Sequence, residues 1–230
     1  MPAMTIGREV RFNANRVGFF GHSQGSLSGP LWMAAEQGGS IAMLSGAGSS
    51  FNLAVTQKRE PVDIPTTLAV LLGISTSNPE EIVPLHPMLT MLQTAIDVSD
   101  PVNYGRYLAR EPRAGIRPRN VFLTQGFVDS YSPPATAAAL ALAIGLPLIN
   151  PVLHTVDQYD LSGIPAATLP VVGNATGGVA TLGWQQFDAP RGRDGHFVVF
   201  NVPEATARTA RFFGSWARSP QNVAELLRAE

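Results

Sequence analysis

The stretch that decides the fold is Arg16-Val-Gly-Phe-Phe-Gly-His-Ser-Gln-Gly25, followed by the segment from Leu27 to Gln37. Its first five residues form a short apolar run, which is typical of a buried parallel strand. The segment that follows is rich in Leu, Met and Ala and predicts a helix. Between them, Gly21 to Gly25 is a G-x-S-x-G turn, which exposes a serine hydroxyl on a strained backbone. We therefore expect Ser23 to be a nucleophile. We also expect both glycines to be required, because side chains there would collide with the neighbouring strand and helix.

Composition restricts the class of protein. The chain has 230 residues and 45% hydrophobic content, which suits one globular domain over residues 1–230. Its net charge is −1 and no basic stripe stands out, so we expect no nucleic-acid partner. The chain contains no cysteine, which excludes disulfides and thiolate metal sites. We expect neither a metal nor another cofactor.

No part of the sequence predicts a membrane span. The segment from Ala135 to Leu148 is shorter than the roughly 18 apolar residues that a span needs, and it contains Pro147. Residues 1–9 show no basic region followed by an apolar stretch, so we expect no signal peptide. We expect a soluble protein, cytoplasmic as expressed, whose natural location the sequence leaves unknown.

Three further apolar runs predict strands, at residues 40–44, 120–124 and 181–187. Helical segments lie between them, and residues 133–144 are the clearest, with two prolines near the start and Gly145 just after the end. Residues 204–227 are expected to be mainly helical, with an interruption near Pro220. Strands that alternate with helices predict an α/β fold with a mainly parallel sheet.

Two long segments between the strands are expected to be insertions. Residues 51–118 carry helical periodicity in pieces broken by prolines, which predicts a helical cap over the site. Residues 146–180 are irregular and dense in Pro, Gly and Asn, which indicates an insertion near the pocket. The loop at residues 45–50 is rich in glycine and serine, and we expect it to line the pocket.

The ends of the predicted strands offer a base and an acid for Ser23. Functional residues in parallel sheets gather at the carboxyl ends of the strands. Asp129 follows the third strand and His196 follows the fourth, which gives the order Ser23, Asp129, His196. A neutral imidazole takes the proton of a serine nucleophile, and a carboxylate on the far side of the ring fixes its tautomer. Asp194, Asp157 and Asp160 are alternatives for the acid.

His196 is favoured as the base among four histidines. His86 lies in the expected cap and His154 in the irregular segment. His22 is adjacent to Ser23, and we expect its ring to point away from the position of the base. We count it only as a candidate for substrate binding. The backbone N–H of Gln24 is the expected donor to an oxyanion.

These motifs resemble the α/β-hydrolases of the esterase/lipase type. The resemblance runs from about Asn13 to the end of the chain, through the elbow sequence, the Gly-x-x-Asp-x-x-x-Pro pattern at 126–133 and Gly-His at 195–196. It implies that the four predicted strands correspond to the fifth through eighth strands of the family. The expected fold is thus an α/β-hydrolase-like, reduced, mainly parallel sheet with a helical cap insertion.

The resemblance implies a carboxylic-ester hydrolase that acts on a small-molecule ester through an acyl-enzyme. A thioesterase, an amidase or a peptidase would use the same triad and stays an alternative. A catalytically inactive module that serves in binding or assembly is the alternative from a different class.

The resemblance also predicts that a second oxyanion donor and a cover for the edge strand must be supplied by other parts of the chain or by a second copy. In the family, a second oxyanion donor comes from a loop after the third strand. Here we expect it from the cap, from the 45–50 loop or from a neighbouring subunit. The strand at 16–20 is expected to lie at a sheet edge, where an apolar strand has to be covered. We therefore expect residues 1–12 to fold over it, or a homo-oligomer to form through it.

Overall fold

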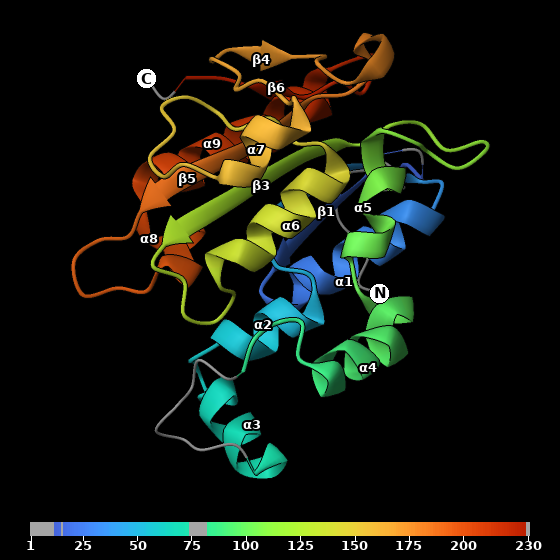
Figure 1. Ribbon diagram of the computed structural model, residues 1–230. Coiled ribbons are helices and arrows are strands. Elements are labelled where there is room, and N and C mark those ends of the chain that lie inside the picture. Colours follow the sequence, from blue (N-terminus) through green and yellow to red (C-terminus); the bar gives the residue numbers. More distant parts are fainter. Residues whose placement is uncertain (1–11, 15, 74–81, 229–230) are drawn as a thin grey trace, which may run out of the picture.

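A four-stranded parallel sheet forms the centre of the molecule, in the order β1-β2-β3-β5 (Figure 1). The computed structural model describes residues 12–14, 16–73 and 82–228. The strands are β1 (Val17–His22), β2 (Gly39–Ser45), β3 (Asn120–Phe127) and β5 (Leu182–Asp188). Each apolar run that predicts a strand forms one, and the α/β class with a parallel sheet is confirmed.

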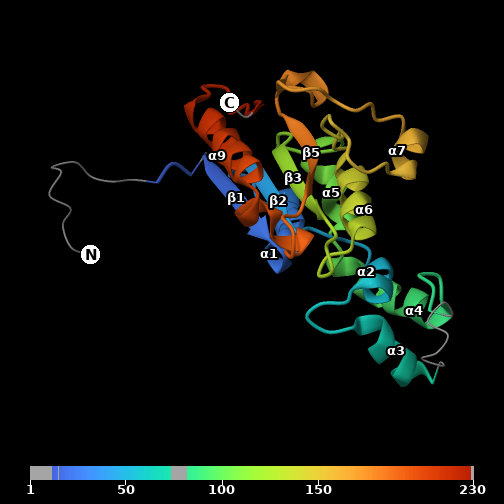
Figure 2. The same cartoon turned by 90° about the vertical axis from the view of Figure 1, so that its left-hand side faces the viewer.

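Helices cover both faces of the sheet. They are α1 (Gln24–Ala35), α5 (Val102–Ala109), α6 (Pro134–Ile144) and α9 (Pro203–Arg218). On β2, Ala42 and Leu44 are buried with α1, α5 and α6, whereas Ile41 and Met43 are buried on the opposite face with α9. Figure 2 shows α9 on one side of the sheet and α5 and α6 on the other. Burial on both faces explains why the strands are continuous apolar runs.

The strand register aligns the carboxyl ends of the sheet. His22 at the end of β1 pairs with Ser45 at the end of β2, and Ser45 pairs with Thr124 of β3. Thr124 in turn pairs with Gln185 of β5. The loops that follow the four strands therefore leave the sheet at one edge, where residues distant in sequence can meet.

A small helical lobe, residues 51–73 and 82–99, lies beyond this edge, at the bottom of Figure 1. It contains α2 (Phe51–Gln57), α3 (Ile64–Leu72), α4 (Pro87–Ile96) and the 3-10 turn η2 (Asp97–Ser99). Its own core consists of Val55, Ala69, Ile82 and Leu89. The remainder of the expected cap segment includes α5, which packs against α1 and α6.

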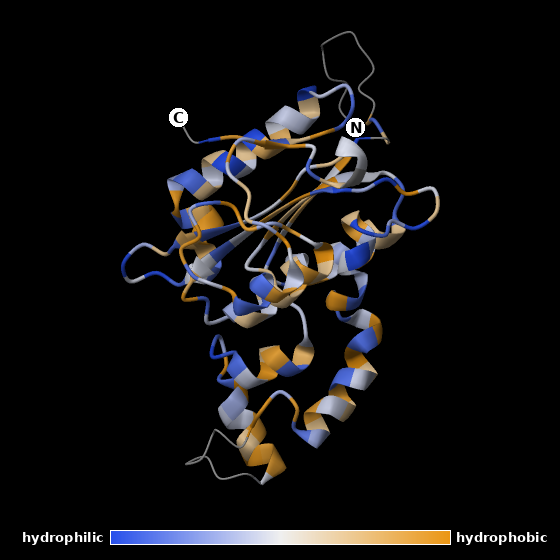
Figure 3. Ribbon diagram, turned by 45° about the horizontal axis from the view of Figure 1, so that its top comes forward, coloured by the Kyte–Doolittle hydropathy of each residue, from blue (hydrophilic) through white to orange (hydrophobic). Residues whose placement is uncertain are grey.

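The helices α3 and α4 are rich in apolar residues, which are the orange segments of the lobe in Figure 3, and some of these side chains are exposed. Leu71, Leu85 and Met91 are 74%, 80% and 68% exposed. No helix within the described ranges is both long enough and apolar enough to cross a membrane.

The C-terminal part differs from the expected helix over residues 204–227. α9 ends at Arg218, and β6 (Glu225–Leu226) pairs antiparallel with β4 (Val171–Val172). Leu226 is buried in the core beneath α9, and the N–H of Ala224 donates to Asn120 Oδ1 at 2.8 Å. These contacts hold the chain extended after Pro220, where a resumed helix could not make them. The remaining short elements are α7 (Asp157–Ser162), η3 (Thr176–Gly178), η4 (Gly195–Phe197) and α8 (Val198–Asn201).

β1 lies at the edge of the sheet, and its outer side pairs with none of the described strands. Val17 and Phe20 are 37% and 44% exposed there. The guanidinium of Arg16 donates to the carbonyls of Ala217 and Ser219, which ties the start of β1 to the end of α9. Of the residues expected to cover this edge, 1–11 lie outside the described residues. Both that expectation and pairing with a second copy stay predictions.

Candidate active site

Ser23 lies in a tight turn between β1 and α1 with φ 54° and ψ −122°. A positive φ strains a residue that has a side chain, so neighbouring contacts must hold it. The N–H of Ser23 donates to the Ser45 carbonyl at 2.9 Å. Ser26 Oγ lies 2.8 Å from the Gly21 carbonyl and accepts the N–H of Ser45 at 3.0 Å. Bonds to β2 therefore fix the strained turn.

The two glycines of the motif differ in what they allow. A Cβ on Gly21 would lie 2.6 Å from the Phe19 ring and 2.7 Å from the backbone of Gly25. A Cβ on Gly25 would meet nothing within 4 Å, so the prediction that glycine is needed there is wrong. The close approach of α1 to β1 occurs at Gly21 and Gly29, which both lie against Phe19.

Asp129 and His196 form a buried pair at the same edge of the sheet. Asp129 follows β3, and His196 lies in η4 after β5. His196 Nδ1 is 3.0 Å from Asp129 Oδ2 and 3.1 Å from Oδ1. Asp129 Oδ1 also accepts the N–H of Tyr131 at 2.9 Å and of Ser132 at 2.6 Å. The carboxylate is thus held in place, and a proton on Nδ1 would leave Nε2 as the acceptor.

The His196 ring is packed on three sides. Tyr131 stacks on it with centroids 4.8 Å apart and an interplanar angle of 23°. The His22 ring lies 4.8 Å away on a tilted plane, so the expectation that His22 points elsewhere is wrong. A Cβ on Gly46, which has φ +52°, would lie 2.6 Å from His196 Cε1. Because Gly46 follows the residue that binds the N–H of Ser23, the turn and the ring are neighbours.

His22 is a second imidazole beside His196, and its pKa is lowered by its surroundings. Its Nδ1 is 3.3 Å from Ser45 Oγ, and its Nε2 is buried without a hydrogen-bond partner among the described residues. Burial, and then the positive charge that His196 can carry, lower the pKa of His22 to about 4. His22 is therefore neutral at pH 7.

The three alternative acids have other contacts or lie in other parts of the fold. Asp194 accepts the N–H of His196 at 2.8 Å and that of Ser130 at 3.2 Å, so it links two loops through their backbones. Asp157 lies in the first turn of α7, and Asp160 lines a different cavity. In the described part of the chain, the carboxylate that bonds the His196 ring is that of Asp129.

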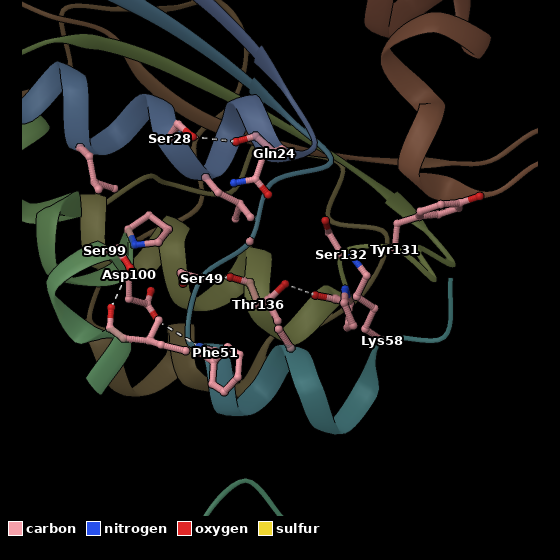
Figure 4. Close-up of a pocket in the computed structure, with 17 residues that line it drawn as sticks. Gln24, Ser28, Ser49, Phe51, Lys58, Ser99, Asp100, Tyr131, Ser132 and Thr136 are labelled. Carbon is pink, nitrogen blue, oxygen red and sulfur yellow. Dashed lines mark hydrogen bonds between the residues drawn. The ribbon is translucent and has the colours of Figure 1, made fainter. Parts of the chain in front are cut away.

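A cavity of about 400 Å³ opens beside the turn and is shown in Figure 4. Its lining includes Gln24, whose N–H has no acceptor among the described residues and is therefore available to an anion. Of the predicted site residues, Gln24 lines the cavity, whereas Ser23, Asp129, His196 and His22 do not. Residues 146–180 do not line it either. The apolar part of the wall consists of Leu27 and Leu31 from α1, Phe51, Ala54 and Ile96 from the lobe, and Pro101 and Pro133. The 45–50 loop contributes Gly48 and Ser49, as expected from its composition.

Sequence reasoning missed three residues of this region, namely Gly46, Lys58 and Tyr131. No local sequence pattern indicates a role for Tyr131, because that role depends on stacking against His196, which lies 65 positions later in the chain. Lys58 is the one lysine in the chain, and this composition signal could have drawn attention to it. Within the described ranges, no three histidine or carboxylate side chains gather in a way that could hold a metal ion.

Comparison with protein-family models finds no match, and neither does comparison with curated proteins. Among solved structures, the chain is similar to a puromycin-hydrolyzing peptidase from Mycobacterium tuberculosis, with 14% sequence identity and a TM-score of 0.45. The match covers 88% of this chain and 22% of that chain. A likeness of this size carries no argument about the activity of the present chain.

Proposed function

We propose that the protein is a serine hydrolase of the α/β-hydrolase type that cleaves small carboxylic esters, with Ser23, His196 and Asp129 as its catalytic triad. The observation that carries the proposal is the buried His196–Asp129 pair at 3.0 Å, at the sheet edge where the strained turn of Ser23 ends β1. A carboxylate that is almost inaccessible to water and bonded to an imidazole is the arrangement that activates a serine.

The proposed chemistry proceeds in two steps. Ser23 Oγ attacks the acyl carbon while His196 Nε2 takes its proton, and Asp129 stabilises the imidazolium that forms. The imidazolium then returns the proton to the leaving alcohol as the ester C–O bond breaks. In the second step, His196 takes a proton from water, whose oxygen attacks the acyl carbon. The imidazolium then gives this proton to Ser23 Oγ as the acyl–oxygen bond breaks, which releases the acid and restores free Ser23 and neutral His196.

The N–H of Gln24 would stabilise the oxyanion in both steps. Loss of one such donor costs about 10²–10³ in turnover, so the second donor matters. Two of its expected sources, the 45–50 loop and the helical lobe, line the same cavity as Gln24. We propose that the lobe acts as a cap, because Phe51, Ala54 and Ile96 form part of the cavity wall.

Hydrolysis of 4-nitrophenyl butyrate by the wild type and by Ser23→Ala tests the proposal. We expect the variant to lose activity by a factor on the order of 10⁶, down to the uncatalysed background where that is reached first. If the wild type and Ser23→Ala are equally inactive, the proposed enzymatic function is wrong and a binding or assembly module is favoured. A fluorophosphonate probe should label Ser23, and labelling of another serine would refute the assignment of the site.

A further inference from the structure

Lys58 stands out by composition and by position. It is the single lysine of a chain with 16 basic residues, the other 15 being arginines. It forms the C-terminal cap of α2 and lines the same cavity as Gln24. The residue is half-buried and forms part of the cavity wall.

The positive charge of Lys58 has no counter-charge among the described residues. No carboxylate lies within ion-pair distance of its ammonium there, whereas the neighbouring Arg59 pairs with Asp63 at 2.9 Å. Asp100 is the other charged residue of the wall, but its carboxylate already accepts the N–H groups of Ser50, Phe51 and Val102 and the amide of Gln93. Figure 4 shows Asp100 on the opposite side of the cavity from Lys58.

Backbone contacts hold Lys58 near the proposed catalytic groups. The N–H groups of Arg59 and Glu60 both donate to the Ser130 carbonyl, at 3.0 and 3.1 Å. The chain directly after Lys58 is therefore tied to the loop that carries Asp129. In Figure 4, Lys58 lies on the same side of the cavity as Tyr131, which stacks on the ring of His196. The cation thus lies on the histidine side of the cavity.

The cavity wall as a whole is largely apolar. An ammonium without a counter-charge can form a charge-assisted hydrogen bond with a carboxylate on a ligand. An apolar body of a few carbon atoms would fill the remainder of the roughly 400 Å³. Both requirements are met by an ester that carries a carboxylate at one end.

We propose that Lys58 selects substrates that carry a carboxylate, so that the preferred substrate is an apolar ester with an anionic group on its acyl chain or its leaving group. This proposal rests on the function proposed above. It makes Lys58 a specificity-determining residue with no part in the bond-breaking steps.

Matched pairs of esters test the selection. For the acyl side, mono-4-nitrophenyl glutarate is compared with 4-nitrophenyl pentanoate. For the leaving-group side, 3-carboxy-4-nitrophenyl butyrate is compared with 4-nitrophenyl butyrate. We expect Lys58→Met to lower kcat/KM for the anionic member of one pair by about 10- to 100-fold and to leave the neutral member within about threefold. Lys58→Arg should retain most of the preference. The pair that responds identifies the position of the carboxylate.

An equal loss for both members of each pair, or no loss for either, would overturn the selection by Lys58. If Ser23 is required for hydrolysis of the neutral esters while Lys58→Met changes no ratio, this inference fails and the proposed function stands. If no ester is hydrolysed, the proposed function fails, and the inference is then tested by binding.

The single lysine makes the binding test direct. A lysine-selective acylating reagent can modify only Lys58 and the α-amino group, and the two products are separated by peptide mass spectrometry. On Ser23→Ala protein, phenylacetate should slow the modification of Lys58 at least about threefold more than the neutral isostere phenylacetamide does, because only the anion pairs with the ammonium. Equal protection by the two ligands would refute a carboxylate site at Lys58.

Discussion

The carboxyl edge of the sheet and the helical lobe both line one cavity, yet they are built differently. At the sheet edge, Asp129 and His196 are 3% and 2% exposed, and two backbone N–H groups together with the imidazole hold the carboxylate. The lobe has a core of four buried apolar residues, and large side chains such as Leu85 lie on its surface. The chain after α2 donates two hydrogen bonds to the Ser130 carbonyl, and Phe51 and Gln93 of the lobe donate to Asp100 in the cavity wall.

This difference suggests a division of roles. Groups that transfer protons must keep their geometry within a fraction of an ångström, and a buried, fully bonded sheet edge provides that. A region with few buried contacts opens and rearranges at lower cost, which suits the admission and selection of a substrate. Substitutions at the edge should therefore affect turnover, and substitutions in the lobe should affect specificity or local stability.

Among the substitutions that compare the sheet edge with the lobe, the largest effect is expected at the carboxylate of Asp129. Asp129→Asn keeps the shape of the side chain, but it cannot stabilise the imidazolium or hold the same tautomer. We expect kcat for ester hydrolysis to fall by about 10⁴. Asp194→Asn is the matched control, since Asp194 bonds only backbone N–H groups near the ring, and we expect a loss of about tenfold or less. A larger loss for Asp194→Asn than for Asp129→Asn would assign the acid to Asp194.

Alanine substitutions at two glycines compare the sheet edge with the helical lobe. Gly46 at the sheet edge and Gly73 in the lobe both have positive φ, at +52° and +66°. An added methyl group at Gly46 would press on His196 Cε1, whereas at Gly73 it would meet nothing within 4 Å. We expect Gly46→Ala to lower kcat by about 10² through displacement of the ring. Gly73→Ala should leave kcat unchanged and cost about 1 kcal/mol of stability. Equal kcat values for the two variants would contradict the close packing of the His196 ring.

The sheet could be predicted from sequence because its signal is local. A strand buried on both faces favours an apolar run, and β2 and β3, which are buried over nearly their whole length, contain such runs at residues 41–44 and 121–123. The helix α2 has no such signal, since it is 7 residues long and only Val55 is buried along it. The strand β6 also lacks a local signal, because contacts with distant parts of the chain hold Ala224 and Leu226 in an extended conformation.

The residues of the candidate site also differ in whether a local sequence pattern predicts them. Ser23, Asp129 and His196 each follow a recognisable strand, so their approximate meeting place follows from the topology of a parallel sheet. The stacking of Tyr131 on His196 and the position of Lys58 depend on how separate loops pack, which no short motif specifies. The motif was also misleading at Gly25, where space for a side chain exists.

Two buried leucines test whether the lobe unfolds separately. Leu123 in β3 and Leu89 in α4 are both 0% exposed. Leu123→Ala removes contacts from the main core and should lower the free energy of global unfolding by about 2–5 kcal/mol in urea titrations. Leu89→Ala should lower it by about 1 kcal/mol, while hydrogen exchange speeds up in α3 and α4. The same global loss for both variants, with unchanged exchange in the lobe, would mean that the lobe and the sheet unfold as one unit.

The smallest effect concerns the neutral imidazole beside the site. The pKa of His22 is lowered from 6.5 to about 4 in the folded state, so between these values the unfolded chain binds a proton that the folded protein resists. This contribution to stability is fully present above pH 6.5 and is lost as the pH falls toward 4. Because the ring is only partly buried, we expect a loss on the order of 1–2 kcal/mol between pH 7 and pH 4.5. His22→Phe keeps a ring between His196 and Phe200 without the titrating nitrogen, and it should lose less stability over this interval. Urea unfolding of both proteins at the two pH values measures the difference. An identical fall in the two proteins would show that the acid sensitivity arises at other groups and that His22 is not held neutral by its surroundings.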